Sequence, residues 1–274
     1  MMATPLGLRG WRLFTRMASP FARLMLRQRA ARGKEDWTRM NERLGVAGVA
    51  RPEGRLVWVH GASVGESLSA LPLIGKLRED ATVLVTSGTV TSAALLGQRL
   101  PAGVLHQFVP LDSPGAVARF LDHWRPDAGL FIESDLWPNL ILGAHARGVK
   151  LALVNARISA ASAERWRWAK KSVGALLAAF DMVLAQDEDV AERFHSLGAH
   201  NVQVVGSLKA DAPPLSCDLD FARKLTVGRA TPKPHGPREP ADWRQRSRFE
   251  LDMLPSIDTF RFPPAEVPSN IHAD

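Results

Sequence analysis

The residues best suited to chemistry lie in a turn that follows a short apolar run, His60-Gly-Ala-Ser-Val-Gly-Glu66. This turn is not a Walker A loop, since only three residues separate its glycines and an acidic residue replaces the lysine. A carboxylate at the start of a helix is kept ionised by the helix dipole and can accept a proton from a hydroxyl group. Glu66 is therefore a candidate general base, although the same dipole favours an acidic residue that merely begins a helix.

Three further polar groups also follow apolar runs. Glu133 ends such a run, where an acidic group is costly unless it is used or paired, so it is either a site residue or half of an ion pair. Arg157 and Ser159 could bind an anion or cap the next helix. Lys209 could stabilise a negative charge or pair with Asp211. The spacing of the histidines is not that of metal ligands, so no metal is expected.

These residues must be positioned by the elements that precede them. Short apolar runs alternate with helix-like stretches such as 63–78 and 189–197. This alternation predicts an α/β fold, a parallel sheet with helices on both faces, in which ligands bind at the carboxyl ends of the strands. The predicted strands are residues 55–60, 81–86, 104–109, 128–133, 150–154, 181–185 and 201–205.

Length and composition limit the alternatives. A chain of 274 residues holds one large domain or two modest ones, and 46% apolar with 23% charged residues excludes wholesale disorder. The single cysteine, Cys217, excludes an intrachain disulfide framework and fits a reducing compartment. The chain has no apolar run long enough to predict a transmembrane helix.

The net charge of +7 is concentrated at the N-terminus, because residues 1–55 hold twelve Lys and Arg residues against four acidic ones. At about 100° per residue, one set of residues forms a narrow basic stripe and another forms a separate apolar arc. Pro20 is expected to kink or split this helix. The stripe is Arg9, Arg12, Arg16, Arg23 and Arg27, and the arc is Leu6, Leu13, Phe14, Met17, Phe21, Leu24 and Met25.

A basic amphipathic helix of this kind is typical of a segment that lies in an anionic membrane interface. The alternatives are a surface helix that packs its apolar face on its own domain, a cleaved signal peptide and a nucleic-acid arm. The arginines interrupt any signal-peptide apolar region, and the aromatic residues sit on the apolar face rather than between the arginines. We therefore expect a membrane partner and no nucleic acid.

The regular pattern stops near residue 212. Residues 213–274 contain ten of the nineteen prolines and have neither strand nor helix periodicity. The expected organisation is an amphipathic membrane-associating segment (1–32), an α/β domain (33–212) and an irregular tail (213–274), disordered or translated out of frame.

Five motifs, in this order and spacing, resemble those of the Kdo transferases: HGASVGE, FVPLDSPGAVARFL, IESDLWPNLI, NARIS and VVGSLKAD. Gly33-Lys-Glu35 and Glu42-Arg-Leu-Gly45 extend the resemblance, which covers about residues 20–212. These enzymes transfer 3-deoxy-D-manno-oct-2-ulosonic acid (Kdo) from CMP-Kdo to the lipid A precursor, lipid IVA, in lipopolysaccharide synthesis.

The resemblance implies an inverting GT-B-type glycosyltransferase on the cytoplasmic face of the inner membrane, held there as a peripheral or monotopic protein. Its N-terminal Rossmann-like domain would bind the lipid acceptor, and a C-terminal domain would bind CMP-Kdo. No cofactor is implied beyond this donor substrate.

The resemblance also assigns roles to residues. Glu66 would be the proton acceptor, and Glu133 and Lys209 would stabilise the transition state. Ser134 and Asp135 stand where the family usually has Thr and Glu. The expected acceptor-binding residues are Ser63, Gly65, Arg157 and Ser207.

The motifs of a donor domain do not follow residue 212. The expectation is a truncated or frameshifted product that would bind CMP-Kdo only if a C-terminal domain were supplied. The main alternative is a non-catalytic remnant that binds acceptor lipid or membrane, and a further one is an unrelated nucleotide-sugar enzyme such as an epimerase.

Overall fold

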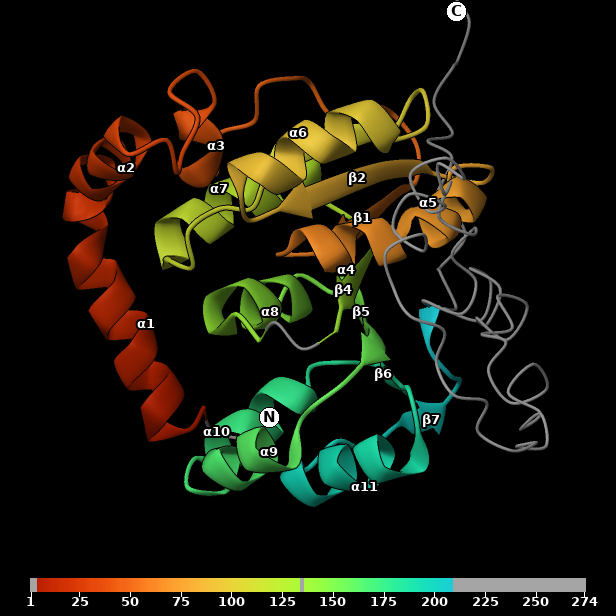
Figure 1. Ribbon diagram of the computed structural model, residues 1–274. Helices are drawn as coiled ribbons and strands as arrows, with labels where there is room; N and C mark the ends of the chain where they lie inside the picture. The colour runs from red at the N-terminus through yellow and green to blue at the C-terminus, as the bar shows by residue number, and fades with distance from the viewer. Residues whose placement is uncertain (1–3, 134–135, 209–274) are drawn as a thin grey trace, which may run out of the picture.

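The computed structural model describes residues 4–133 and 136–208, which form a seven-stranded parallel sheet with helices on both faces (Figure 1). The strand order is β3-β2-β1-β4-β5-β6-β7, which contains the Rossmann order. All seven predicted strands are confirmed within two residues at each end, and so is the predicted fold class. The strands are β1 (Leu56–His60), β2 (Thr82–Ser87), β3 (Leu105–Phe108), β4 (Ala128–Ile132), β5 (Lys150–Ala156), β6 (Met182–Ala185) and β7 (Val202–Val204).

Two apolar cores cover the two faces of the sheet. Alternate residues of one strand enter different cores, so Trp58 packs in one core and Val57 and Val59 in the other. This arrangement explains the near-continuous apolar runs in the sequence. One face is covered by α4 (Val64–Ser69), α5 (Leu71–Leu77) and α6 (Val90–Arg99), and the other by α7 (Pro114–Trp124), α8 (Pro138–His145), α9 (Ala160–Arg167), α10 (Lys170–Leu177) and α11 (Glu188–Leu197).

The helix predicted over residues 63–78 is two helices, so that prediction is wrong in detail. Helix α4 ends before Ala70, and α5 begins at Leu71 with Pro72 in its first turn. Proline lacks the backbone N–H that a continuous helix would need at this position. The helix predicted over 189–197 is confirmed as α11.

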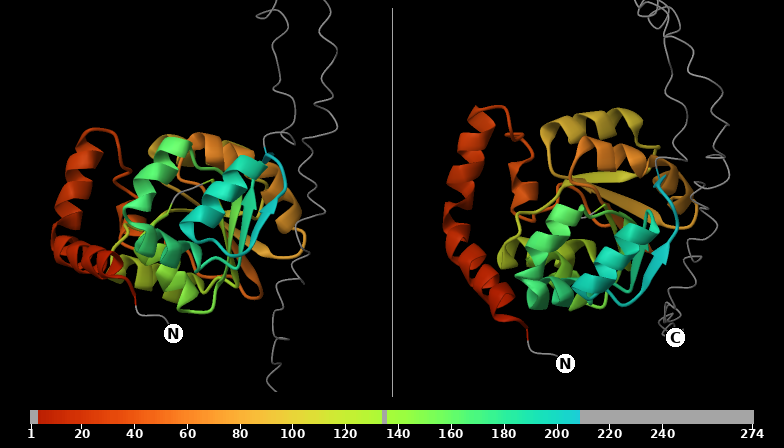
Figure 2. Two further views of the ribbon diagram at one scale, coloured as in Figure 1. Left: turned by 90° about the horizontal axis from the view of Figure 1, so that it is seen from below. Right: turned by 60° about the horizontal axis from the view of Figure 1, so that its bottom comes forward.

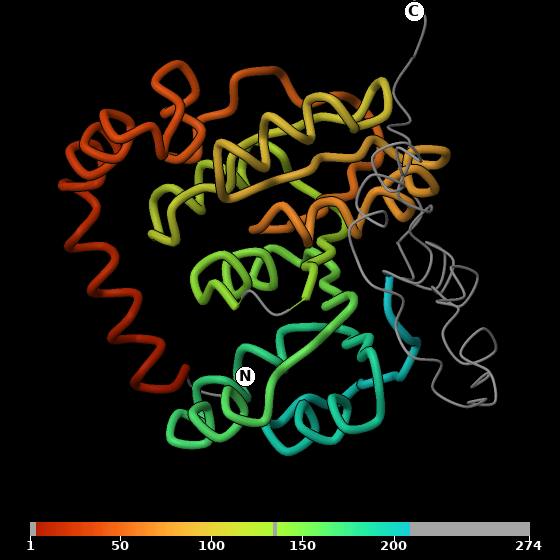
Figure 3. The backbone as a smooth tube through the Cα atoms, viewed as in Figure 1, coloured from red at the N-terminus to blue at the C-terminus, as the bar shows by residue number. Residues whose placement is uncertain are grey.

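The N-terminal segment forms an arm along one side of the domain, as Figure 3 shows. It consists of α1 (Leu6–Ala18), a 3₁₀ turn (Ser19–Phe21) and α2 (Ala22–Ala31). The predicted break at Pro20 is confirmed, because Pro20 lies in the 3₁₀ turn between the two helices. A further short helix, α3 (Met40–Arg43), follows the arm.

The apolar arc of this arm faces solvent. Leu8, Leu26 and Ala30 are buried against the domain, whereas the predicted arc is exposed, from 43% at Met25 to 80% at Leu6. A surface helix that packs its apolar face on its own domain is therefore the wrong interpretation of this segment. Within residues 4–133 and 136–208, no helix is both long enough and apolar enough to cross a bilayer.

Helix α1 is fixed at the carboxyl edge of the sheet by Asp112, which lies between β3 and α7. Trp11 donates its indole N–H to Asp112 Oδ2 at 2.7 Å, and Asn139 Nδ2 donates to Thr15 Oγ1 at 3.1 Å. The Asp112 carboxylate also accepts the backbone N–H of Leu140 at 2.9 Å and so caps α8. Burial raises the pKa of this carboxyl above its ordinary value.

Replacing Trp11 by Phe keeps an aromatic ring but removes the hydrogen bond to Asp112. Because a hydrogen bond to a charged group contributes about 1.5–3 kcal/mol, amide hydrogen exchange in α1 should become about 10- to 100-fold faster. Trp37→Phe is the matched control, since Trp37 is exposed and its change should leave this exchange rate as it is. Unchanged exchange in the Trp11 variant would show that this bond does not hold the arm.

Candidate active site

The two candidate carboxylates flank the point where the strand order reverses. Strands β1 and β4 are neighbours with His60 opposite Phe131, although β2 and β3 lie between them in the sequence. In open α/β sheets, ligands bind in the crevice outside the carboxyl ends of two such strands. Glu66 follows β1 and Glu133 follows β4 directly, so both belong to this edge.

The carboxylate of Glu66 is held by its own turn. Ala62 N–H donates to Oε2 at 2.8 Å and the Ser63 hydroxyl donates to Oε1 at 2.6 Å. Ser63 in turn caps α4 by accepting the N–H of Glu66 at 3.3 Å. This arrangement is a variant of the capping box. It is compatible both with Glu66 as a general base and with Glu66 as a residue that only begins a helix.

The turn itself rests on the end of β2. Gly88 N–H donates to Ala62 O at 3.2 Å, and Gly61 N–H donates to Thr86 O at 3.1 Å. A Cβ atom at Gly88 would lie 2.9 Å from Ala62 O, closer than side chains come in folded proteins. A glycine at position 88 thus lets the turn that carries Glu66 pack tightly on β2.

Arg43 extends this support to the N-terminal segment. Its guanidinium donates to Gly88 O and, at 3.1 Å, to Val109 O, and it pairs with Glu35 at 2.8 Å. Arg43 and Glu35 are both buried. A continuous chain of hydrogen bonds therefore runs from Glu35 through Arg43, Gly88 and Ala62 to the carboxylate of Glu66.

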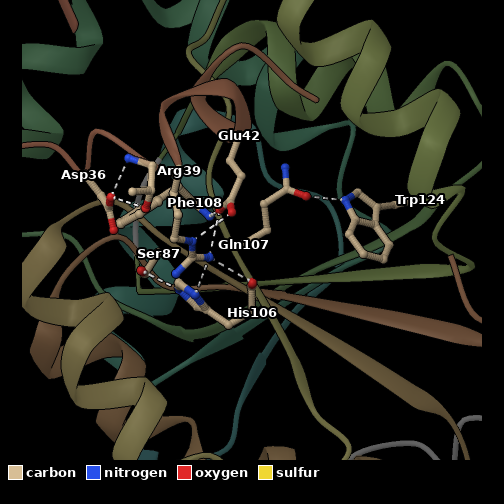
Figure 4. A network of polar contacts seen from close by, with 9 residues as sticks. Asp36, Arg39, Glu42, Ser87, His106, Gln107, Phe108 and Trp124 are labelled. Atoms are coloured by element: carbon tan, nitrogen blue, oxygen red, sulfur yellow. Dashed lines mark hydrogen bonds and ion pairs between the residues drawn. The ribbon is translucent and has the colours of Figure 1, made fainter. Parts of the chain in front are cut away.

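A second arginine anchors the same segment to β3, as Figure 4 shows. Arg39 makes two hydrogen bonds of 2.8 Å to Glu42 and one of 3.0 Å to His106 O. Glu42 also accepts the backbone N–H of Phe108 at 2.7 Å. The guanidinium carbons of Arg39 and Arg43 lie 4.7 and 4.9 Å from the centre of the Phe108 ring, in cation–π contact.

The glycine that ends Glu42-Arg-Leu-Gly45 has a steric reason. Gly45 has a φ of +81°, and a Cβ there would lie 1.9 Å from Ala116 O. Only glycine fits this contact between the segment and α7. The two short motifs near the N-terminus are thus structural parts that attach the arm and support the Glu66 turn.

Two histidines, the buried His60 and the partly buried His106, make the fold sensitive to acid. Burial lowers the pKa of His60 to about 4, and burial together with Arg39 and Arg43 lowers that of His106 to about 4. Unfolded histidine titrates near 6.5, so only the unfolded chain takes up these protons as the pH falls from about 6.5 to 4. The stability that the two neutral imidazoles contribute is therefore present above pH 6.5 and lost below it.

Urea unfolding at pH 7 and pH 5 tests this effect. The wild-type chain should lose up to about 2 kcal/mol per histidine between these pH values, at 1.36 kcal/mol per pKa unit. His60→Gln should reduce this loss even though it lowers stability at pH 7. An unreduced loss in the variant would contradict the role of His60.

The ends of β4 and β5 both adopt a left-handed backbone. Glu133 has a φ of +67° and Asn155 a φ of +56°. Asparagine adopts this conformation readily, but for glutamate it is costly, and such costs concentrate at functional sites. The N–H of Glu133 donates to Val154 O at 2.9 Å, which places Glu133 beside the start of the NARIS motif.

Asn155 joins the last two motifs. Its side-chain oxygen accepts the N–H of Leu208 at 3.1 Å and Gln186 Nε2 at 3.0 Å, and the residue is fully buried. In the sequence, Asn155 stood out only as the first residue of the NARIS motif, and this role was missed. The signal available was an asparagine at the end of a buried strand, a position that favours a left-handed turn.

The other predicted residues are placed as follows. Ser63 lies on the Glu66 carboxylate, and a Cβ at Gly65 would meet no atom within 4 Å. Arg157 is exposed, and among the described residues it has no hydrogen-bond or ion-pair partner. Ser207 directly precedes Leu208, which Asn155 holds. Ser159 caps α9 by accepting the Ser162 N–H at 3.2 Å, so capping was the correct alternative for it.

Some predictions lie outside the described residues, namely those for Lys209, Ser134, Asp135 and the tail 213–274. No group of three or more potential metal ligands occurs in residues 4–133 and 136–208. A cavity of about 430 Å³ lies at the amino ends of β1 and β2, lined by residues such as Glu53, Arg55 and Arg78. It is at the opposite edge of the sheet from Glu66.

The family model of 3-deoxy-D-manno-octulosonic-acid transferase (kdotransferase) matches residues 38–212. The chain belongs to the Kdo transferase family. It is 43% identical over 159 residues to a probable mitochondrial 3-deoxy-D-manno-octulosonic acid transferase of Arabidopsis thaliana, and 39% identical over 208 residues to the transferase of Bordetella pertussis.

This Kdo transferase family member spans 36% of the length of the Arabidopsis relative and 49% of the Bordetella relative. The matches cover 57% and 73% of the present chain. Among solved structures, MnaA of S. aureus in complex with UDP is similar with a TM-score of 0.48 and 15% identity, over 63% of this chain and 52% of that one.

Proposed function

We propose that this chain provides the acceptor half of a glycosyltransferase that moves Kdo from CMP-Kdo to lipid IVA, with Glu66 as general base. The observation that carries the proposal is the position of Glu66 and Glu133 at the carboxyl ends of β1 and β4, where the strand order reverses. Two carboxylates from different motifs share the edge at which α/β proteins bind ligands.

In this mechanism Glu66 removes the proton from an acceptor hydroxyl, whose oxygen attacks the anomeric carbon of Kdo. The bond from that carbon to the phosphate oxygen of CMP breaks in the same step, so the configuration inverts. The hydrogen bonds from Ala62 and Ser63 aim the Glu66 carboxylate, which must be positioned within hydrogen-bonding distance of the hydroxyl.

Glu133 and Lys209 stabilise the charge that develops in the transition state. The left-handed backbone of Glu133 supports a functional position for its side chain. Ser63, Gly65, Arg157 and Ser207 contribute to the acceptor site, and the exposed guanidinium of Arg157 suits the phosphate groups of lipid IVA. CMP-Kdo is the donor substrate, and a separate C-terminal domain of the enzyme would bind it. No metal or cofactor takes part in the base step.

The protein acts at the cytoplasmic face of the inner membrane, as a peripheral or monotopic protein. The exposed apolar arc of the arm, flanked by its arginine stripe, supports contact with an anionic bilayer. Because Trp11 and Thr15 fix α1 at the carboxyl edge of the sheet, this contact brings the candidate site close to a lipid acceptor.

The test is the transfer of radiolabelled Kdo from CMP-Kdo to lipid IVA in detergent micelles. The chain is assayed alone and mixed with the C-terminal half of the Bordetella pertussis relative. Transfer that depends on Glu66 supports the proposal. If the chain bound lipid IVA but no transfer occurred, either with the chain alone or with the mixture, the alternative of a lipid-binding protein without catalysis would be favoured.

A further inference from the structure

A second apolar and basic surface lies at the corner between α9 and α10, residues 165–171, which we call the elbow. Trp168 is 88% exposed and Trp166 37% exposed, and neither belongs to the apolar cores. Four exposed cationic residues lie next to them in the sequence, namely Arg165, Arg167, Lys170 and Lys171. Single exposed apolar residues are common, but an indole that is 88% exposed, close in sequence to a second exposed indole and four exposed cationic residues, is a distinct feature.

The elbow lies beside the first turn of α1. Helix α1 packs on α10, and a Cβ at Gly7 would lie 2.7 Å from Ser172 Oγ. Figures 1 and 2 show the start of α1 next to the green helices α9 and α10. At about 100° per residue, Gly7 lies at one border of the exposed apolar arc and the arginine stripe at the other. The elbow therefore adjoins the apolar side of the arm.

We propose that the elbow is a second contact with the anionic bilayer, separate from the amphipathic arm. The indole of Trp168 suits the headgroup level of a membrane, where tryptophan is enriched because its ring is both apolar and polar. The exposed cations of the elbow complement anionic lipid phosphates. Glu164 is the acidic residue at this corner, and it is already paired with Arg167 at 2.9 Å.

The proposed role of this contact rests on the proposed function, in which the acceptor is a membrane lipid. The contact would also limit how the domain can be oriented on the membrane. One amphipathic helix in an interface leaves the domain free to rock about the helix axis. A second contact off that axis fixes the domain. The elbow adjoins the first turn of α1, the helix whose Trp11 is bonded to Asp112 at the carboxyl edge. The elbow thus orients the Glu66 turn toward the lipid.

Vesicle binding by the full chain tests the proposal. The probes are vesicles of phosphatidylcholine with 30% phosphatidylglycerol and vesicles of phosphatidylcholine alone. Trp168→Ala should weaken partitioning into the anionic vesicles about tenfold, and so should the double change Lys170→Gln and Lys171→Gln. Trp37→Ala, at a residue 57% exposed between α2 and α3, is the matched control and should stay within about twofold of wild type.

Because Trp168 and the two lysines are exposed, these variants should keep the circular dichroism spectrum of the wild type. Equal binding by the wild type, Trp168→Ala, the double lysine variant and Trp37→Ala would overturn the proposal and leave the arm as the membrane contact. An equal loss for Trp168→Ala and Trp37→Ala would also overturn it, since any exposed indole would then suffice. Wild-type protein that binds neither vesicle would overturn both membrane contacts, while Kdo transfer in micelles would still test the reaction separately.

Discussion

Replacing Arg43 by Met should destabilise the fold by about 3–5 kcal/mol, which is a large part of the 5–15 kcal/mol that typically holds a domain together. The change leaves Glu35 buried with only its half-exposed partner Arg29 and removes the donor from two carbonyl groups, those of Gly88 and Val109. A buried carboxylate left with one half-exposed partner and two carbonyl groups that lose a donor each carry a desolvation cost.

Urea unfolding measures this loss. Arg29→Ala is the matched control because Arg29 pairs with the same carboxylate, Glu35, but its side chain is 44% exposed. This control should cost less than about 1 kcal/mol. An Arg43→Met variant within about 1 kcal/mol of wild type would show that the buried pair is not central to the fold.

Replacing Glu66 by Gln should lower the rate of Kdo transfer by about 100- to 10,000-fold, the range that a general base contributes. Glutamine also serves in a capping box, so this variant keeps the start of α4. Its amide oxygen can accept the Ala62 N–H and its amide nitrogen can donate to Ser63 Oγ, but it cannot accept a proton from the acceptor hydroxyl. The fall should therefore be in kcat, with binding of lipid IVA to the variant close to that of the wild type.

The comparison requires the transfer assay and a direct measurement of lipid IVA binding. Glu79→Gln changes an exposed carboxylate just after α5, far from the carboxyl edge, and should leave both quantities unchanged. If Glu66→Gln transferred Kdo at the wild-type rate, Glu66 would be a capping residue alone and another group would take the proton.

The sheet was predictable because buried parallel strands are continuously apolar and have no competing local signal. The strand that ends at His60 and its six successors follow this rule. The arm was predictable from a different local signal, its helical spacing. The positions of Leu13, Phe14 and Met17 mark one side of a helix, and that side is exposed. The split near Pro72 was missed because the apolar spacing continues through it and only the missing backbone N–H interrupts the helix.

The support of the candidate site was not predictable, because its partners are distant in the sequence. Arg43 and Gly88 are 45 residues apart and Asn155 and Leu208 are 53 apart, and no local spacing encodes such pairs. The family resemblance assigned roles to Glu66 and Glu133 but none to Glu35, Arg43 or Asn155. The fold assigns these residues to the hydrogen bonds that hold the motifs together.

The attachment of α1 also sets an order of events during synthesis. Trp11 meets Asp112, which is 101 residues later, and Thr15 meets Asn139, which is 124 residues later. At about 5–20 residues per second, the ribosome needs roughly 5–25 s to make these partners after the helix. During that time the side of α1 that carries Trp11 and Thr15 is as exposed to solvent as its apolar arc. The nascent helix is thus exposed to lipid or to a chaperone before its own domain exists to receive it.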